Sequence, residues 1–269
     1  MAVINDFSGF GRCSLTVALP IISAMKIQCC AVPTAVFSNH TGYEDFFMQD
    51  YTDYMPVYFD KWEKLGLTFD GIYTGYLGSV RQVELVKDFI HRFGTENTRI
   101  IVDPVMGDGG KIYSAFGRAL CEEIRELLPL ADIITPNVTE ACILAGQPYR
   151  DDIRTETELL SLCDTLRRLG AKDIVITGIA AGSDIGNFVY HKNGSYSLMT
   201  HEAARSVPRA GTGDVFASVI ASDAVNGAEL SASVEKAAAF VADAVQISDD
   251  FGVPPQDGIC FEEILSRLM

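Results

Sequence analysis

The stretch Arg99-Ile100-Ile101-Val102-Asp103-Pro104-Val105 is apolar except at Arg99 and Asp103. A strand that is covered on both faces has this pattern, because its side chains alternate between two faces that must both be apolar. Runs rich in Val and Ile recur at Val3-Ile4 and over residues 27–37, 71–73, 132–136 and 173–177. Together these runs predict a parallel β-sheet.

Segments of helical periodicity separate the apolar runs, and several carry start and stop signals. Ser14 is the expected N-cap of a helix that reaches Met25, and Ser79 that of a helix over residues 80–93. Further helices are predicted over residues 155–169, 211–227 and 230–251, with a short one ending at Met269. Because βαβ crossovers are right-handed, the helices cover both faces of the sheet. We therefore predict one α/β domain over residues 1–269, a three-layer α/β/α sandwich with a mostly parallel sheet.

Two stretches interrupt this alternation. Residues 42–58 are crowded with aromatic and acidic side chains, which predicts a small lid or a dimer contact. The helical spacing of the aromatic residues there favours a core or interface over a stacking platform. Residues 186–202 alternate like a β-hairpin around Lys192-Asn193-Gly194, which predicts an antiparallel sheet edge.

The composition of the 269 residues excludes several classes of protein. With 48% hydrophobic and 21% charged residues, the chain is typical of soluble globular proteins. Its formal charge of −15 repels nucleic acid and anionic membrane surfaces, so neither is expected as a partner. The sequence has no signal-peptide pattern and no apolar run near the ~18 residues of a membrane span, which predicts a cytoplasmic protein. The seven cysteines include no Cys-x-x-Cys pair and are expected to be reduced and mostly buried.

Gly211-Thr212-Gly213-Asp214 directly precedes the apolar helical run 215–220. Glycines let several backbone N–H groups face one point, and the helix dipole adds positive potential there, so the segment is suited to an anion. An Asp beside a transferring phosphoryl group can orient an alcohol and accept its proton. The alternative is a glycine turn followed by an ordinary acidic residue at a helix start.

Oxygen-rich residues follow three further strands. Asp103 and Asp108 flank a Gly-rich turn and are plausible ligands of Mg²⁺, although solvated turn residues explain them equally well. Asn137 and Glu140 follow the next strand, where a helix capping box is the alternative interpretation. Thr177-Gly178 ends another strand. Ligands of open parallel sheets bind at this carboxyl edge.

These motifs, in this order, resemble the ribokinase-like superfamily of ATP-dependent small-molecule kinases. Within it, Phe37-Ser38-Asn39-His40-Thr41-Gly42-Tyr43 and Thr74-Gly75-Tyr76-Leu77-Gly78-Ser79 are similar to segments of the vitamin B6 kinases. The likeness extends from Asn5 to about Val225. It implies a kinase that phosphorylates the 5′-hydroxymethyl group of pyridoxal, pyridoxine or pyridoxamine.

The resemblance also implies roles for individual residues. Asp214 would be the base, and Gly211, Thr212 and Gly213 would form the anion hole around the transferring phosphoryl group. The residues implied to contact the vitamer are Asp6, Thr41, Gly42, Tyr76 and Asp214. Those implied to bind ATP are Asp103, Asn137, Glu140, Thr177, Gly178 and Thr212, and those implied to hold Mg²⁺ are Asp103, Asp108 and Glu140. A monovalent cation such as K⁺ near the anion hole and a homodimer are typical of the family.

One segment departs from the B6 kinase pattern. Asn5-Asp6-Phe7-Ser8-Gly9-Phe10-Gly11 has Asp6 where many B6 kinases have a substrate-binding serine, and it is closer to hydroxymethylpyrimidine kinases of thiamine synthesis. A hydroxymethylpyrimidine kinase is therefore the first alternative, and a non-catalytic protein that binds a vitamer or nucleotide is the second. A nicotinamide-dependent oxidoreductase is excluded because Gly-x-Gly-x-x-Gly does not follow the first strand. We expect His40 to be a packing or capping residue.

Overall fold

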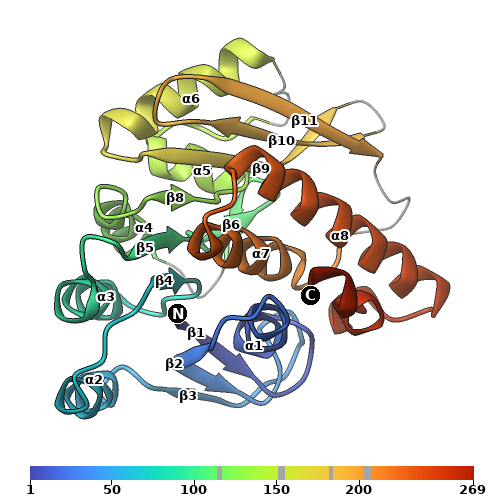
Figure 1. Cartoon of the computed structure of the whole chain (residues 1–269). Coiled ribbons are helices and arrows are strands. Elements are labelled where there is room, and N and C mark those ends of the chain that lie inside the picture. The colour runs from blue at the N-terminus through green and yellow to red at the C-terminus, as the bar shows by residue number, and fades with distance from the viewer. Residues whose placement is uncertain (114–116, 151–154, 182–183, 203–207) are drawn as a thin grey trace.

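The computed structural model describes residues 1–113, 117–150, 155–181, 184–202 and 208–269. Its centre is a nine-stranded sheet in the order β11-β10-β9-β8-β5-β4-β1-β2-β3 (Figure 1). The pairs from β9 through β2 are parallel, whereas β10, β11 and β3 are antiparallel additions at the two edges. The strands of this sheet are β1 (Ala2–Ser8), β2 (Cys30–Phe37), β3 (Met48–Asp50), β4 (Gly71–Thr74), β5 (Arg99–Val102), β8 (Ile133–Ile134), β9 (Asp173–Ala181), β10 (Asp184–Tyr190) and β11 (Tyr196–Glu202).

Helices cover both faces of the sheet (Figure 1). One face carries α2 (Met55–Lys64), α3 (Val80–Phe93), α4 (Arg118–Ile124), α5 (Val138–Ala145) and α6 (Glu156–Arg168). The other face carries α1 (Ser14–Ala24), α7 (Thr212–Asn226), α8 (Leu230–Asp250) and the 3₁₀ helix η3 (Phe261–Leu268). A small hairpin of β6 (Gly107–Asp108) and β7 (Lys111–Ile112) and the 3₁₀ turns η1 (Arg125–Leu127) and η2 (Pro255–Asp257) complete the elements.

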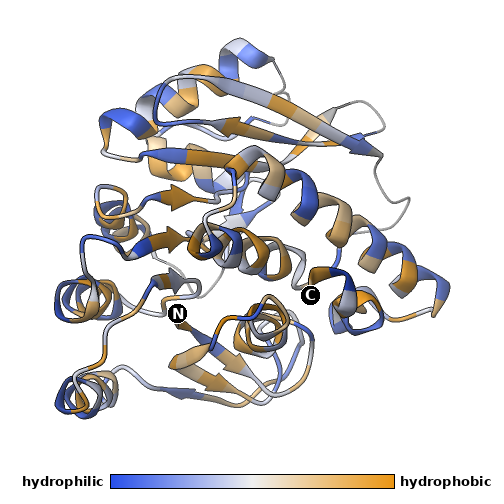
Figure 2. Cartoon of the chain, viewed as in Figure 1, coloured by the Kyte–Doolittle hydropathy of each residue, from blue (hydrophilic) through white to orange (hydrophobic). Residues whose placement is uncertain are grey.

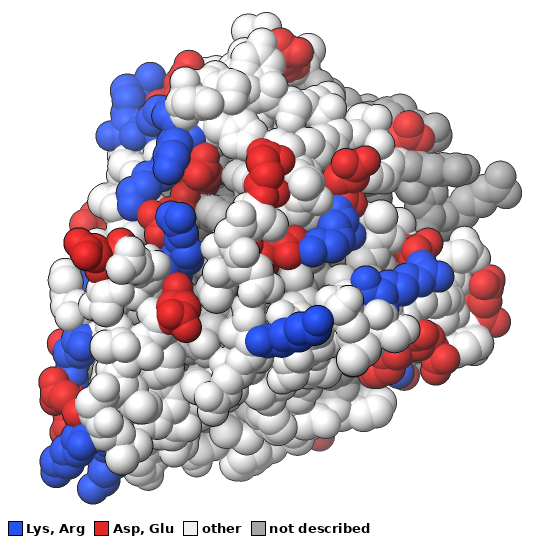
Figure 3. All heavy atoms as spheres, viewed as in Figure 1, with Lys and Arg blue, Asp and Glu red and all other residues white. Residues whose placement is uncertain are grey.

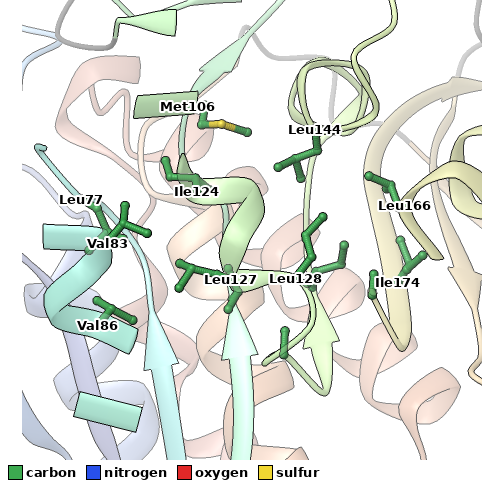
Figure 4. Packing of buried hydrophobic residues seen from close by; sticks show 14 of the residues in the cluster. Leu77, Val83, Val86, Met106, Ile124, Leu127, Leu128, Leu144, Leu166 and Ile174 are labelled. Atoms are coloured by element: carbon green, nitrogen blue, oxygen red, sulfur yellow. The ribbon is translucent and has the colours of Figure 1, made fainter. Parts of the chain in front are cut away.

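The apolar strands divide their side chains between two hydrophobic clusters. Ile4 of β1 and Ile72 of β4 belong to the cluster under α2–α6, whereas their neighbours Val3 and Tyr73 belong to the cluster under α1, α7 and α8. Figure 4 shows part of the first cluster, where side chains from several helices and strands interlock. This period-two division is the reason why the strands are apolar on both faces.

Helix α7 is buried over most of its length. Its residues 215–223 are all buried, and the helix is orange over most of its length in Figure 2. It contacts β4, β5, α1 and α8, so it lies in the middle of its layer. A helix enclosed in this way holds its first turn in a rigid position.

The predicted α/β/α sandwich, the mostly parallel sheet and the hairpin around Lys192-Asn193-Gly194 are confirmed. Ser79 caps α3 as expected, because its side chain accepts a hydrogen bond from the N–H of Gln82. The N-cap prediction for Ser14 was wrong: Cys13 occupies that position, and Ser14 is the first helical residue.

Other predicted elements differ in extent. The strand predicted to end at Thr177 continues to Ala181, since its outer half pairs with β10. The last helix is of the 3₁₀ type. The lid or dimer segment 42–58 contains the short edge strand β3 and the first turn of α2, which had not been predicted. Among the described residues, no helix is long and apolar enough to span a bilayer.

Strand β1 lies between β2 on one side and β4 on the other, so the direction in which successive strands are added to the sheet reverses there. Helix α1 follows β1 on one face, and α3 follows β4 on the opposite face. A crevice at the carboxyl ends of the strands is expected at such a switch point. The fold thus places the residues after β1, β4 and β5 around one location.

Candidate active site

The glycine loop before α7 is packed tightly against the loop before α1. Gly211 has φ +76°, and a Cβ atom there would lie 1.8 Å from the carbonyl oxygen of Arg12. Only glycine can occupy this position, since any side chain would collide with backbone. The first N–H groups of a helix have no partner within the helix, so those at Thr212 and Gly213 are free of the α-helical ladder. The starts of α1 and α7 therefore meet at one point that suits a negatively charged group.

Asp214 lies in the first turn of α7 beside this point. Its Oδ1 is 3.4 Å from Nδ2 of Asn5, which donates a hydrogen bond to it. The pKa of Asp214 is raised to about 6, mainly by burial and also by the nearby charge of Asp6, against the lowering effect of the neighbouring Ser14 backbone and Asn5 amide. A carboxylate with this pKa is mostly ionised at neutral pH and can accept a proton from an alcohol.

Asp6 is buried and forms its hydrogen bonds within its own loop. Its Oδ1 accepts a 2.5 Å hydrogen bond from the Ser14 hydroxyl, and its Oδ2 accepts one of 3.0 Å from the Ser8 hydroxyl. Burial raises the pKa of Asp6, whereas the two serine hydroxyls lower it. The structure thus gives Asp6 a role in holding the start of α1, and its contact with a substrate stays a prediction.

Asp103 and Glu140 form a buried acidic pair at the same edge of the sheet. Asp103 accepts a hydrogen bond from the Thr135 hydroxyl (3.1 Å), and Glu140 accepts the N–H groups of Met106 (3.0 Å) and Asn137 (2.9 Å). Burial, followed by the charge of Glu140, raises the pKa of Asp103 well above its usual range. The pKa of Glu140 is raised to about 8, again mainly by burial.

This buried acidic pair is suited to bind a cation. In the part of the chain that the structure describes, Asp103, Glu140 and Asp214 form no ion pair with a Lys or Arg. A bound cation would stabilise the ionised carboxylates, whose pKa values burial raises.

Asp108 does not join this pair. It lies exposed on the β6–β7 hairpin, where its Oδ1 accepts the N–H of Gly109 (2.7 Å). Correspondingly, no group of three or more His, Cys, Asp or Glu among the described residues is arranged to hold a metal ion. Asp103 and Glu140 form the buried pair, the charge of Asp108 also raises the pKa of Glu140, and a magnesium site made by all three carboxylates stays a prediction.

Four of the residues expected to bind a nucleotide lie on two neighbouring segments, Asn137 and Glu140 between β8 and α5, and Thr177 and Gly178 on β9, whereas Asp103 follows β5 and Thr212 begins α7. Asn137 forms an isolated parallel bridge with Thr177, and Gly178 follows with φ +70° where the register between β9 and β10 shifts. Asn137 and Glu140 also form a capping box at the start of α5, the alternative interpretation that the sequence analysis gave for them. The Asn137 amide also donates to the carbonyl of Gly107 (2.9 Å). A contact of these residues with ATP stays a prediction.

Thr41 and Gly42 lie exposed on the loop after β2, and this loop is joined to the C-terminal turn η2. His40 Nε2 is 2.7 Å from the carbonyl oxygen of Gln256, and His40 Nδ1 accepts the N–H of Gly42 (3.1 Å). The Tyr43 hydroxyl donates to Asp257 (2.6 Å). These bonds give His40 the packing and linking role that the sequence favoured over acid–base chemistry.

Tyr76 lies at the end of β4 with its ring edge against Phe37, the ring centroids being 5.9 Å apart. Burial raises the pKa of its hydroxyl to about 12, so the ring is neutral. Its N–H donates to Oδ1 of Asn5 (2.8 Å), the same side chain that faces Asp214. A Cβ atom at Gly75 would lie 2.4 Å from the Asn5 amide, so glycine there admits this side chain.

Two residues of the site were not identified from the sequence as contacts of Asp214. Asn5 is a polar residue in the middle of the central strand β1 and is fully buried, and a polar residue inside an apolar strand is a signal that could have identified it. Ser14 was assigned to helix capping, and nothing in the local sequence shows that its backbone is close enough to lower the pKa of a residue 200 positions away.

The chain matches one family model, described as phosphomethylpyrimidine kinase, over residues 19–258. Bos taurus pyridoxal kinase is 31% identical over 218 residues, which cover 74% of this chain and 69% of that protein. A Caenorhabditis elegans relative described as a candidate pyridoxal kinase is 33% identical over 221 residues. The match covers 71% of this chain and 64% of the relative, so the chain spans less than two thirds of that protein's length.

Crystal structures with the same fold cover nearly the whole chain. Pyridoxal kinase from Lactobacillus plantarum has a TM-score of 0.91 and 29% identity, covering 100% of this chain and 95% of its own. A candidate phosphomethylpyrimidine kinase from Bacteroides thetaiotaomicron, crystallised with pyridoxal, has a TM-score of 0.93 and 38% identity. That match covers 99% of this chain and 94% of the other.

Proposed function

The chain belongs to the phosphomethylpyrimidine kinase family of the ribokinase-like superfamily, and on that basis we propose that it is an ATP-dependent kinase for a vitamin B6 vitamer. The acceptor is the 5′-hydroxymethyl group of pyridoxal, pyridoxamine or pyridoxine, and the role is salvage of the phosphorylated vitamer. The observation that carries the proposal is the position of Asp214 at the joint start of α1 and α7. The pyridoxal in the crystals of the Bacteroides thetaiotaomicron relative supports the substrate class.

In the proposed reaction, the protein's own groups orient the alcohol and hold the charge of the phosphoryl oxygens. Asp214 accepts a hydrogen bond from the hydroxymethyl group and takes its proton as the new P–O bond forms. The N–H groups of Gly211, Thr212 and Gly213 face the transferring group. Asp103 and Glu140 would hold Mg²⁺, which supplies neutralising charge to the phosphates when it is bound.

Three further expectations are part of the proposal. ATP would lie along Asn137, Thr177 and Gly178, which the fold places side by side. A monovalent cation near the glycine loop, a homodimer and a cytoplasmic location follow from the resemblance alone. They are tested by the K⁺ dependence of turnover, by light scattering and by cell fractionation.

A hydroxymethylpyrimidine kinase is the second candidate function. The observations that favour it are the loop Asp6-Phe7-Ser8-Gly9 and the description of the matching family model. A protein that only binds the ligand is disfavoured, because Asp214, Asp103 and Glu140 are all present at one sheet edge.

The test is phosphorylation of pyridoxal, pyridoxamine, pyridoxine and hydroxymethylpyrimidine by the purified protein with ATP and Mg²⁺, with the product identified by mass. We expect the highest kcat/KM for a B6 vitamer. Asp214→Asn should lower kcat by about 10²- to 10⁴-fold and leave ATP affinity nearly unchanged, because it removes the proton acceptor. Asp250→Asn, an exposed carboxylate at the end of α8, is the matched control. Turnover of the pyrimidine alone, or full activity of Asp214→Asn, would contradict the proposal.

A further inference from the structure

Asn5 is a polar residue in the middle of β1, and its side chain is fully buried. Val3, two positions earlier, packs in the cluster under α1 and α7, and the period of two places Asn5 on the same face of the sheet. A buried amide costs free energy unless its oxygen and its nitrogen both have hydrogen-bond partners. The partners of Asn5 therefore indicate why an amide, rather than an apolar side chain, occupies this position.

Two backbone N–H groups fix the orientation of the Asn5 amide. Its Oδ1 accepts the N–H of Asp6 (2.9 Å) and the N–H of Tyr76 (2.8 Å). Because N–H groups donate, only the amide oxygen can face them, and the Nδ2 group must lie on the other side. There, Nδ2 donates to Oδ1 of Asp214 over 3.4 Å. The two shorter bonds thus hold a hydrogen-bond donor in a fixed position beside the proposed base.

The backbone around Asn5 is shaped to hold this amide. The N–H of Gly75 donates to the carbonyl of Ile4 (2.9 Å), directly after β4 ends at Thr74. The next N–H along the chain, that of Tyr76, bonds to the Asn5 side chain instead. A Cβ atom at Gly75 would lie 2.4 Å from Nδ2 of Asn5, and the three atoms nearest to it all belong to that side chain. Glycine at position 75 therefore leaves the space that the amide occupies.

We propose that Asn5 is a positioning residue, whose amide is anchored through Oδ1 to β1 and to the segment after β4 and donates from Nδ2 to Asp214, so that this carboxylate is oriented towards the acceptor alcohol. The inference rests on the proposed kinase function, because that function makes Asp214 the base. Tyr76 is predicted to line the vitamer pocket, so the same amide fixes the base relative to that pocket. A misplacement of about 1 Å between a base and its substrate can lower turnover about 100-fold.

The kinetic test is a double-mutant cycle of Asn5→Ala and Asp214→Asn. In the wild-type background, we expect Asn5→Ala to lower kcat about 10- to 100-fold and to change the KM for ATP less than about twofold. In the Asp214→Asn background, the same substitution should lower kcat less than about twofold, because the carboxylate that Asn5 orients is absent. A role of Asn5 in folding alone would lower kcat by the same factor in both backgrounds, and that result would overturn the inference.

The matched control for this cycle is Asn226→Ala. The Asn226 amide donates to the carbonyl of Met25 (3.2 Å) at the other end of α7, so it makes a comparable bond far from Asp214. Its loss should leave kcat unchanged in both backgrounds.

A second variant displaces the Asn5 amide without removing it, and it decides the question if Asn5→Ala does not fold. Gly75→Ala adds a Cβ atom against Nδ2 and should lower kcat by about the same factor as Asn5→Ala. Gly71→Ala is its matched control, because a Cβ atom at this end of β4 would lie 2.5 Å from the Val225 side chain. It should lower the stability in urea and leave kcat unchanged. Equal kcat for Gly75→Ala and the wild type would overturn the inference.

A third readout does not depend on activity. In ¹H–¹⁵N spectra, the side-chain amide resonance of Asn5 should shift as the pH falls through about 6, where Asp214 takes up a proton, and most of that shift should be lost in Asp214→Asn. The side-chain amide of Asn226 should not shift in either protein. The other titratable groups that interact with Asp214 are the same in both proteins: Asp6, Cys13, Tyr73, Asp103 and Tyr113.

The two proposals fail in different ways. An Asn5 resonance that shifts equally in the wild type and in Asp214→Asn, or that does not shift, would overturn the inference even if the kinase activity is confirmed. If the wild type phosphorylates none of the four substrates, the proposed function fails, and the resonance still decides whether Asn5 holds Asp214.

Discussion

At the scale of single residues, the site is a set of carboxylates whose pKa values are all raised by burial. Asp214, Asp103 and Glu140 lie at one edge of the sheet, and each has different hydrogen-bond partners. Asn5 donates to Asp214, Thr135 donates to Asp103, and the N–H groups of Met106 and Asn137 donate to Glu140. Separate environments for acidic groups of the same type are a common way to give them separate tasks. Here Asp214 is suited to accept a proton, and the other two are suited to hold a cation.

The pH dependence of kcat/KM follows from the pKa of about 6 at Asp214. The base acts in its ionised form, so kcat/KM for the vitamer should be constant near neutral pH and fall as the pH decreases through about 6. Asp6→Asn removes a negative charge that raises this pKa, and the acid limb should therefore move to lower pH. The measurement is a pH profile of kcat/KM for the wild type, Asp6→Asn and Asp250→Asn.

Other titratable groups near Asp214 could also change the pH dependence of kcat/KM. Those that interact with its charge are Asp6, Cys13, Tyr73, Asp103 and Tyr113. The pKa values of Cys13 and the two tyrosines are raised, so these groups stay neutral over the acid limb. An acid limb that moves to higher pH in Asp6→Asn would contradict the assignment.

At the scale of elements, the contact between the starts of α1 and α7 holds the glycine loop in place. Gly211 touches the backbone of Arg12, and the same loop is tied to the C-terminal segment through Arg209, which donates to Asp249 (2.6 Å) and to the carbonyl of Val253 (2.9 Å). The N–H of Ala210 donates to the carbonyl of Pro255. The glycine loop is thus held rigidly against both ends of the chain, as a preorganised anion site requires.

Replacing Gly211 tests this contact. Gly211→Ala adds a Cβ atom 1.8 Å from a backbone oxygen and imposes a strained φ of +76°, so we expect at least about 2 kcal/mol of lost stability and a kcat at least 100-fold lower. Gly227→Ala is the matched control, because Gly227 has φ +78° at the other end of the same helix with open space around it. It should cost about 1 kcal/mol and leave kcat unchanged.

The measurements for this pair are urea denaturation and steady-state kinetics. Equal losses in the two variants would show that the contact with Arg12 does not constrain the loop.

At the scale of the whole molecule, two apolar clusters on opposite faces share one sheet, and the charged side chains lie on the outside. On the face shown in Figure 3, Lys and Arg alternate with Asp and Glu along the left rim, and much of the remaining surface is uncharged. The cluster under α2 and α3 is rich in aromatic rings. Phe89 packs against Phe59 and Phe93 with centroid distances of 4.9 and 4.5 Å, and Trp62 lies 6.2 Å away.

Phe89→Ala should destabilise the protein by about 3–5 kcal/mol, because it leaves a cavity among rings that are fully enclosed. Trp62, the single tryptophan of the chain, reports unfolding in urea by its fluorescence. Phe251→Ala, at an exposed phenylalanine after α8, should change the stability by less than about 0.5 kcal/mol. A loss below about 1 kcal/mol for Phe89→Ala would show that the aromatic cluster is not part of the core.

The sequence by itself determined the α/β/α layers, the hairpin and the glycine loop with its aspartate, because each depends on periodicity or on residues that are adjacent in the chain. Only the tertiary structure decided that Asp103 and Glu140 are buried while Asp108 is exposed on a hairpin, and that Ser14 begins α1 in a left-handed conformation. It also decided that Asn5 faces Asp214, 209 residues away. Contacts of this kind arise from the order of strands in the sheet and from the packing of α1 on α7, which no local pattern of residues encodes.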